Sequence, residues 1–353
     1  VYSYGSEPYH STSVLGQSSL EVYICLGTMT PIHSMQRSVG FSRFLEASVF
    51  PTSLNPIASF SNSKTALNSY RNQLQRITNC MLKSFCWPFL AVCTLILPTE
   101  AAAQLDTEFW FVAPEIWANH GDAPILLRFS TLDEAAEVTV DQPANAGFPV
   151  QNISVPATGT ATLDLTAWLG IIENKPSNQV LARGLRIVSS APITAYYEVN
   201  HPENTDIFTL KGGASLGTQF YVPFQTNLTN NFTQSTAGID VIATSDGTEV
   251  TVVPTENLNG HPAGVAFSFT LNAGETYGMR ASATNGPGHP SGTLITSNHP
   301  IAVTVSDDSV LNGACWDMMG DQIIPASLAG EEHIAVKGNL SGPDKVYLVA
   351  TED

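Results

Sequence analysis

The chain has 353 residues, of which 31 are acidic and 14 basic, and its formal net charge is −17. A surface this acidic repels phosphate backbones, so nucleic acid is not an expected partner. Only one of the five cysteines, Cys315, follows residue 103, so an internal disulfide is not expected within residues 104–353, which would depend on hydrophobic burial.

A change of composition divides the chain near residue 80. Residues 1–80 are rich in Ser and show no lasting apolar period, so we interpret them as disordered or as a spurious upstream extension, with a genuine pro-segment as the alternative. Lys83 and the apolar run Phe85–Leu97 precede Ala101-Ala-Ala103, a small-residue cleavage pattern. This order predicts a signal peptide at 81–103 and a mature start near Gln104. No apolar run long enough to span a bilayer follows it.

After residue 103 the pattern is that of β-strands, separated by Gly, Pro, Asn and Asp and recurring every roughly 8 to 14 residues. In chain order the predicted strands are 108–114, 124–130, 136–140, 150–155, 160–165, 182–189, 193–200, 219–224, 239–244, 249–253, 266–271, 276–280, 293–296 and 301–306. One or two helical turns are predicted within 162–171. Ile239–Val252 is predicted to be a hairpin, because Asp246-Gly247 is a tight-turn signal.

Several blocks of sequence occur more than once. Gly184–Ile193 matches Gly292–Ile301, which aligns Ile187 with Ile295 at a shift of about 108 residues. Leu348–Asp353 likewise repeats part of Ile239–Val252. The repeats predict an all-β fold of tandem β-sandwich modules of roughly 110 residues, at 104–215 and 216–329, with a truncated third module begun at 330–353. A β-propeller is the alternative.

Six of these segments, taken together and in this order, resemble the N-terminal domain family of the IgGFc-binding protein. The resemblance covers 104–353, and the segments are Thr107–Glu115, Asp206–Leu210, Leu216–Phe224, Ile239–Val252, Gly320–Pro325 and Tyr347–Asp353. The family is named for a mucosal animal protein that binds the Fc part of IgG, and it also looks common in large exported proteins of Bacteroidetes-type bacteria. The resemblance implies an extracellular or surface-attached binding role. It does not imply that this chain binds IgG.

One motif is typical of a hydrolase. Gly213-Ala-Ser215-Leu-Gly217 matches G-x-S-x-G, which in a nucleophile elbow lies between a strand and a helix. Here a strand is predicted to follow, and Ala-Ser-Leu recurs at 326–328. We therefore interpret Ser215 as part of a structural turn and predict no catalytic residue.

Two loops of equivalent position are predicted after the strands 193–200 and 301–306. Their oxygen-bearing side chains are possible ligand or Ca²⁺ groups, although the spacing fits no EF-hand and a solvated acidic loop is the simpler interpretation. The candidates are Glu203, Asp206, Asp307, Asp308, Asp317 and Asp321. Asp321 is also expected to cap nearby backbone N–H groups.

Cys315 and Trp316 lie in the second of these loops. We expect a buried thiol beside a packed indole, with a pairing or reactive thiol as the alternative. The histidines show no zinc-ligand spacing, and no other cofactor is predicted.

The sequence thus favours a non-enzymatic protein, secreted or at the cell surface, that recognises a protein or glycan partner through the loops of its modules. A structural spacer is the alternative, and a serine hydrolase using Ser215 is a third hypothesis.

Overall fold

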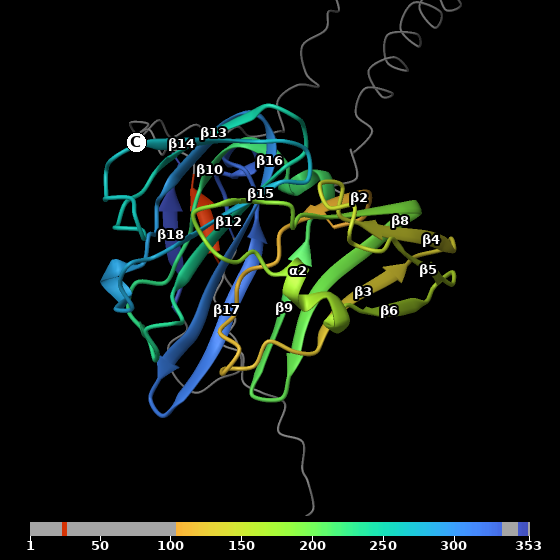
Figure 1. Ribbon diagram of the computed structural model, residues 1–353, viewed down its shortest axis with the longest axis horizontal. Coiled ribbons are helices and arrows are strands. Elements are labelled where there is room, and N and C mark those ends of the chain that lie inside the picture. Colours follow the sequence, from red (N-terminus) through yellow and green to blue (C-terminus); the bar gives the residue numbers. More distant parts are fainter. Residues whose placement is uncertain (1–22, 27–103, 334–344, 352–353) are drawn as a thin grey trace, which may run out of the picture. The chain divides into compact units, whose positions relative to one another are not determined.

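The computed structural model describes residues 23–26, 104–333 and 345–351 (Figure 1). The predicted signal peptide, most of the upstream segment and part of the predicted third module lie outside the described residues. The described part is dominated by strands, which confirms the all-β fold class. Its short helices are η1 (Thr166–Trp168), α2 (Leu169–Ile172), η2 (Gly212–Ser215), η3 (Gly286–Gly288) and η4 (Ala326–Leu328). The first two are the helical turns predicted within 162–171.

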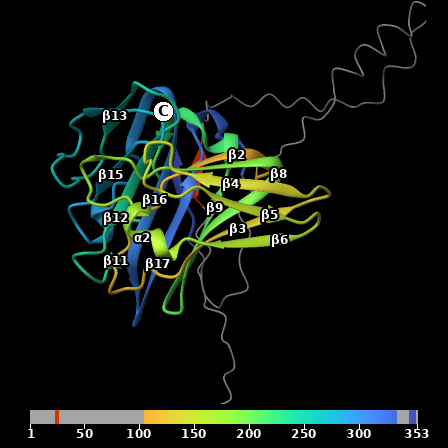
Figure 2. The same cartoon turned by 45° about the vertical axis from the view of Figure 1, so that its right-hand side comes forward.

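The first module has seven main strands. They are β2 (Asp106–Phe111), β3 (Ile125–Thr131), β4 (Ala136–Asp141), β5 (Gln151–Val155), β6 (Thr160–Asp164), β8 (Leu185–His201) and β9 (Asn204–Leu210). The long strand β8 pairs with β2 and β4 along its first part and with β3 and β9 along its second part. One strand therefore contributes to both layers of a sandwich, and Figures 1 and 2 show β2 and β4 in one layer and β3 and β6 in the other.

The second module repeats this arrangement. Its main strands are β10 (Gly217–Tyr221), β12 (Ala237–Ala243), β13 (Thr248–Val253), β14 (Phe267–Leu271), β15 (Thr276–Arg280), β16 (Leu294–Asn312) and β17 (Cys315–Ile323). Two short strands join this sheet, β7 (Val180–Leu181) beside β15 and β11 (Thr229–Asn230) beside β16. Two others, β1 (Tyr23–Leu26) and β18 (Tyr347–Ala350), pair in parallel as a separate two-stranded sheet. Here β16 takes the place of β8, because it pairs with β10 and β13 and then with β12 and β17.

The two isoleucines aligned by the repeat occupy equivalent places. Ile187 lies between Val140 and Phe109 in its sheet. Ile295 lies between Val252 and Phe220 in the other module. Both isoleucines are fully buried, each in the hydrophobic core of its own module. The predicted repeat is confirmed at this position, and burial of alternate strand residues explains why its apolar side chains recur.

The predicted hairpin at Ile239–Val252 is wrong. Gly247 does have a positive φ of 68°, as the turn signal requires, but β12 and β13 do not pair with each other. β12 pairs with residues 301–307 of β16, and β13 pairs with residues 294–297. The turn is thus an arch between the two layers, held where β16 bends by a hydrogen bond of 2.7 Å from the Thr244 hydroxyl to the Pro300 carbonyl.

The two long loops predicted after 193–200 and 301–306 are also wrong. The chain continues as the hairpins β8–β9 and β16–β17, which do occupy equivalent positions in the two modules. β17 contains several polar residues, and these made it look like a loop. Their polarity instead reflects the contact between the two modules, described next.

One layer of the second module is covered on both faces. Every residue of β12 and β15 is buried, although a sandwich strand normally buries alternate residues. On the outer side of this layer, Ile242 and Ala302 pack against Trp110 and Val112 of the first module. The Gln322 side chain also donates a hydrogen bond of 2.7 Å to the Trp110 carbonyl. We call this contact between the modules the junction.

Candidate functional site

The six predicted acidic residues do not form one site. Glu203 lies exposed at the tip of the β8–β9 hairpin, and Asp317 lies exposed near the tip of the β16–β17 hairpin. The two tips adjoin, because the Asn204 side chain accepts a hydrogen bond of 3.1 Å from the Met318 N–H. The Asn204 amide group also donates to the Gly121 carbonyl at 3.0 Å. Asn204 therefore ties the hairpins together.

Asp321 joins β17 to β9. Its Oδ1 accepts hydrogen bonds from the N–H groups of Gln322 at 2.9 Å and Thr209 at 2.8 Å. Its Oδ2 lies 2.6 Å from the Lys211 ammonium. Asp321 thus has the expected capping role. Its carboxylate also accepts the Thr209 N–H on the outer edge of β9, a group that another strand would otherwise be able to pair with.

Asp206 lies on β9 and faces the same contact. Burial, together with the smaller effect of the charges of Asp317 and Asp321, raises the pKa of its carboxyl to about 7. Its Oδ1 accepts a hydrogen bond of 2.8 Å from the Ile207 N–H, whereas its Oδ2 is buried without a hydrogen-bond partner in the described part of the chain. With a pKa of about 7, the Asp206 carboxyl is therefore partly protonated at neutral pH.

Asp307 is buried within β16, inside the second module. It accepts hydrogen bonds from the side chains of Asn230 at 2.7 Å and Gln225 at 2.9 Å, and the His289 ring lies 3.3 Å away. These contacts attach the segment around β11 to β16. The function they support is structural, because every polar atom of Asp307 is directed at the protein itself.

Asp308 faces the other side of β16, at the junction. Its Oδ1 lies 2.6 Å from Nδ1 of His120, and its Oδ2 accepts a hydrogen bond of 2.9 Å from the Trp117 N–H. The Ser309 hydroxyl lies 2.9 Å from the same Nδ1. A Ser-His-Asp triad needs the serine at Nε2 and the aspartate at Nδ1, so this buried group lacks the catalytic arrangement. Among residues 104–333 and 345–351, no group of three or more His, Cys, Asp or Glu is placed to hold a metal ion.

Ser215 lies in η2 and is fully buried. Its hydroxyl donates a hydrogen bond of 2.7 Å to the Gly212 carbonyl. The recurrent Ala-Ser-Leu at 326–328 forms η4 at the equivalent place after β17. A nucleophile elbow presents an exposed serine, so the buried Ser215 belongs to the structural turn that the sequence predicted.

The expectation of a buried thiol beside a packed indole is wrong. Cys315 is exposed and free, and the Trp316 side chain next to it is 41 % exposed. The Phe232 ring contacts Trp316 at a centroid distance of 5.7 Å and Trp117 at 4.5 Å. We call these three residues the aromatic patch. Its most exposed member, Trp316, lies on β17 near the tip of the β16–β17 hairpin.

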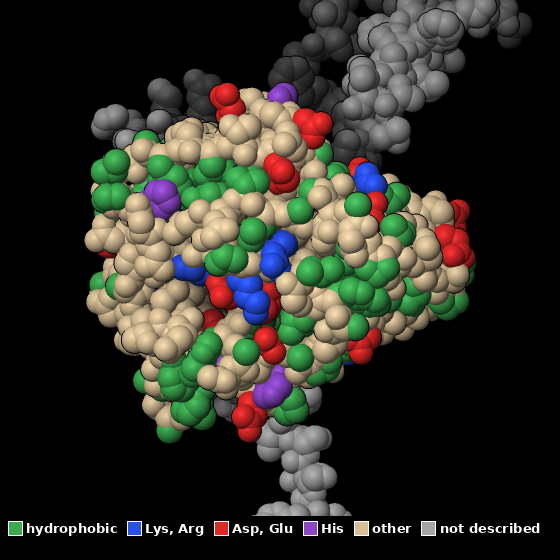
Figure 3. Space-filling model, in the orientation of Figure 1, with side chains coloured by type: hydrophobic (Ala, Val, Ile, Leu, Met, Phe, Trp, Pro, Cys, Tyr) green, Lys and Arg blue, Asp and Glu red, His purple; other side chains and the backbone are tan. Residues whose placement is uncertain are grey.

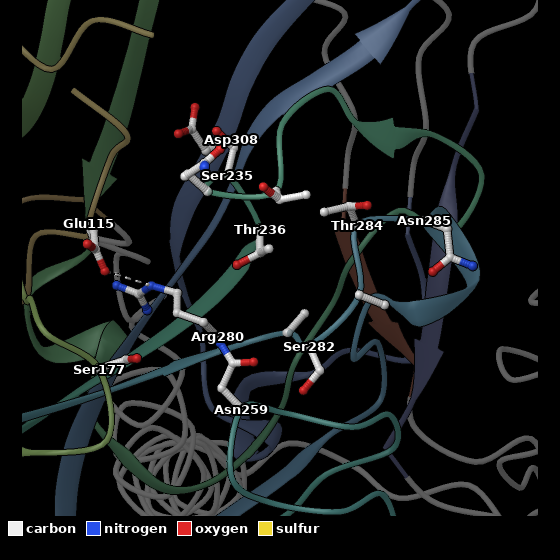
Figure 4. Close-up of a pocket in the computed structure, with 14 residues that line it drawn as sticks. Glu115, Ser177, Ser235, Thr236, Asn259, Arg280, Ser282, Thr284, Asn285 and Asp308 are labelled. Carbon is white, nitrogen blue, oxygen red and sulfur yellow. Dashed lines mark ion pairs between the residues drawn. The ribbon is translucent and has the colours of Figure 1, made fainter. Parts of the chain in front are cut away.

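A cavity of about 530 Å³ lies at the junction (Figure 4), and its lining includes Thr233, the residue after Phe232. Its lining comes from both modules, since Glu115 and Ser177 belong to the first and the rest to the second. Most of it consists of hydroxyl and amide side chains, on the segments 233–236 and 282–285 together with Asn259. Buried Arg280 and Asp308 also line it. Sequence reasoning missed this site, because short Ser, Thr and Asn segments are equally typical of ordinary surface loops.

A buried ionic network holds Arg280 in place. Its Nη1 donates to both oxygens of Asp240, at 3.1 and 3.0 Å, and its Nε lies 3.7 Å from Glu115. The Asn174 side chain donates to Asp240 at 2.7 Å and comes from the first module. Burial raises the pKa of Asp240 to about 6, although Arg280 and Asn174 act in the opposite direction. Gly278 leaves room for the network, because a Cβ there would lie 2.7 Å from Asp240 Oδ1.

The arrangement of charge on one face agrees with this local pairing. In Figure 3, the Lys and Arg side chains near the middle of the face lie next to acidic side chains. No large basic surface is shown on this face.

These features define a two-module β-sandwich protein with polar and aromatic surfaces where the modules meet. A family model described as IgGFc binding protein matches residues 206–353. This match confirms the predicted resemblance over residues 206–353. Neither the curated proteins nor the solved structures give a match to the chain. Among the helices in its described part, none has the length and apolar character required to cross a membrane.

Proposed function

We propose that this chain is an exported binding or adhesion protein, secreted or held at the cell surface, and that its partner is an extracellular protein. The family match at residues 206–353 supports the general class of binding protein. The family takes its name from a protein described as binding IgG Fc. The choice of partner for this chain rests on its own surface.

The observation that carries the proposal is the aromatic patch. Trp316 is 41 % exposed yet rests on Phe232, which in turn contacts Trp117. Exposed tryptophan is enriched among the residues that contribute most to protein–protein binding. Trp316 lies on β17, which Asn204 ties to the β8–β9 hairpin, so little conformational freedom of this strand is lost on binding.

The test is a binding assay of the full chain against immobilised IgG Fc and mucin. We expect saturable binding to a protein partner and a loss of about 30-fold or more in affinity on Trp316→Ala, the change typical of a central interface tryptophan. Leu132→Ala is the matched control, because Leu132 is 59 % exposed and belongs to the first module. Equal affinities for the wild type, Trp316→Ala and Leu132→Ala would exclude the patch as the contact surface.

A structural spacer is the second candidate, and the junction favours it. The buried network of Asp240, Arg280 and Asn174 fixes one module against the next, which is what a stiff connector needs. Absence of saturable binding to every protein offered, together with an unfolding transition shared by both modules, would support the spacer over the binding protein.

A further inference from the structure

We propose that the cavity at the junction binds a neutral carbohydrate. This inference goes beyond the proposed protein-binding function and concerns a different surface. It uses the cavity of about 530 Å³, which falls within the range of roughly 300–1,000 Å³ seen for small-molecule sites.

The first argument is the supply of unused hydrogen-bonding groups. The side chains of Thr236, Asn259 and Ser282 line the cavity, and within the described residues they make no hydrogen bond to the protein. Hydroxyl and amide groups both donate and accept. A sugar presents the same alternation of donors and acceptors around its ring, so these side chains match it better than they match a purely cationic or purely anionic ligand.

The second argument is charge. The positive charge of Arg280 is offset by Asp240 at 3.0 Å, and both Glu115 and Asp308 also line the cavity. An anionic ligand would therefore meet more negative than positive charge. Sialylated and sulfated sugars are disfavoured on this ground, and neutral sugars are not.

The third argument is the availability of Glu115. Its carboxylate lies 3.7 Å from the Arg280 Nε, which is longer than a hydrogen bond, and it makes no other ion pair and no hydrogen bond within the described part of the chain. Asp308 has no such freedom, because His120 and the Trp117 N–H occupy its oxygens. Figure 4 shows the Glu115 carboxylate directed toward Arg280 at one side of the cavity. A sugar hydroxyl is a suitable donor to this carboxylate.

The fourth argument is that the site is already formed. The Asn259 N–H donates to the Arg280 carbonyl at 2.9 Å, and the Ser282 N–H donates to the Asn257 carbonyl at 2.9 Å. The backbone that carries two of the unused side chains is thus attached to β15 and its neighbours. Apart from Ala281 and Ala283, the lining offers no apolar side chain, so a peptide with a hydrophobic anchor would find no matching surface.

The experiment is a titration of the full chain, by calorimetry, with neutral hexoses, N-acetylhexosamines and their disaccharides. Sialylated and sulfated forms of the same disaccharides provide the anionic comparison. We expect saturable binding of at least one neutral sugar, with its anionic form at least about tenfold weaker. The double variant Asn259→Ala/Ser282→Ala should lose about tenfold or more in affinity, since it removes two hydrogen-bonding groups. Thr270→Ala, on an exposed position of β14, should bind as the wild type does.

Ser282→Trp provides an independent test, because it fills the cavity from an exposed position and should abolish sugar binding while thermal unfolding stays unchanged. No binding of any neutral sugar, or preference for the anionic forms, would overturn the proposal. Unchanged affinity in both the double variant and Ser282→Trp would also overturn it. Trp316→Ala should leave sugar binding intact, so failure of this site and failure of the protein-binding patch give different results.

Discussion

The two modules share a scaffold but differ in what covers one of their layers. In the first module β3 pairs with β6 and β8, and in the second β12 pairs with β15 and β16. The register makes Arg128 the counterpart of Asp240, since each lies three positions before the end of its strand. The Arg128 side chain is 43 % exposed and pairs with Glu198, whereas Asp240 is fully buried and pairs with Arg280. The same sheet position thus belongs to a half-buried ion pair in one module and to a fully buried one in the other.

This difference shows that the repeated inward-facing residues build each sandwich, while the outward-facing residues decide whether a layer meets solvent or a neighbour. Inward positions such as Ile187 and Ile295 are conserved within the chain because both cores need them. The outward positions have diverged, because only one of the two layers lies at the junction.

The largest expected effect distinguishes the two ion pairs. Asp240→Ala leaves Arg280 buried without its partner, and removal of one member of a buried pair typically costs about 3–5 kcal/mol of unfolding free energy. Arg128→Ala removes a partner whose side chain is 43 % exposed, so water can reach the buried Glu198 carboxyl that remains, and we expect a smaller loss of about 1–3 kcal/mol. Urea unfolding of both variants measures the two losses. Similar losses would show that the junction is not formed as described.

The second prediction tests the shared scaffold. Ile187→Ala and Ile295→Ala each leave a cavity in a core, at a typical cost of about 2–5 kcal/mol, and we expect the two losses to agree within about 1 kcal/mol. The same denaturation assay measures them. A loss at one position only would mean that the two isoleucines do not play equivalent parts, in spite of their matching strand neighbours.

Sequence reasoning predicted most of the strands and the repeat, because alternating apolar residues report burial of one face directly. It could not predict which strands pair. The turn at Asp246-Gly247 specifies that the backbone reverses, but not whether β12 and β13 join or enter different layers. Likewise, β17 looked like a loop, because a strand that faces a polar junction lacks the apolar alternation on which the prediction depends.

The candidate site was harder to predict from the sequence, because it too depends on how the strands pair. Asp307 and Asp308 are adjacent in the sequence and were grouped as loop ligands. Ser309, with a positive φ of 54°, follows them at an irregularity in β16, and the two carboxylates enter separate hydrogen-bond networks. Arg280, which lines the cavity, belongs to a strand that the sequence predicted correctly, yet its partner Asp240 lies 40 residues away. Only the fold brings them together.

A third prediction concerns the space around Asp240. Gly278 pairs with Asp240, and Thr162 pairs with Arg128 at the equivalent place in the first module. Gly278→Ala would place a Cβ 2.7 Å from Asp240 Oδ1 and 3.0 Å from the Asn174 side-chain nitrogen. We expect a loss of about 1–3 kcal/mol, as is typical of overpacking. Thr162→Ala should change stability by no more than about 0.5 kcal/mol, because it shortens a surface side chain. Thermal unfolding of the two variants is the measurement. Unchanged stability of Gly278→Ala would mean that Asp240 and Asn174 can move to make room for the added Cβ.

The smallest expected effect is a dependence on pH, and it too should come from the junction. Burial raises the pKa of Asp206 to about 7 and that of Asp240 to about 6, whereas on the exposed side of the first module hydrogen bonds from Thr166 lower the pKa of Asp164. A carboxyl whose pKa is higher in the folded state binds more protons there, so its stabilising contribution is complete below about pH 4 and is lost as the pH rises to about 7. Asp206→Asn keeps the shape but cannot ionise, so it should reduce the fall in unfolding free energy between pH 5 and pH 7 by on the order of 1 kcal/mol. Urea unfolding across this range measures the fall, and Asp164→Asn, which should leave it unchanged, is the control. If Asp206→Asn retained the full dependence, β9 and β17 would not enclose this carboxyl, and the two hairpins would be free to separate at the surface assigned to partner binding.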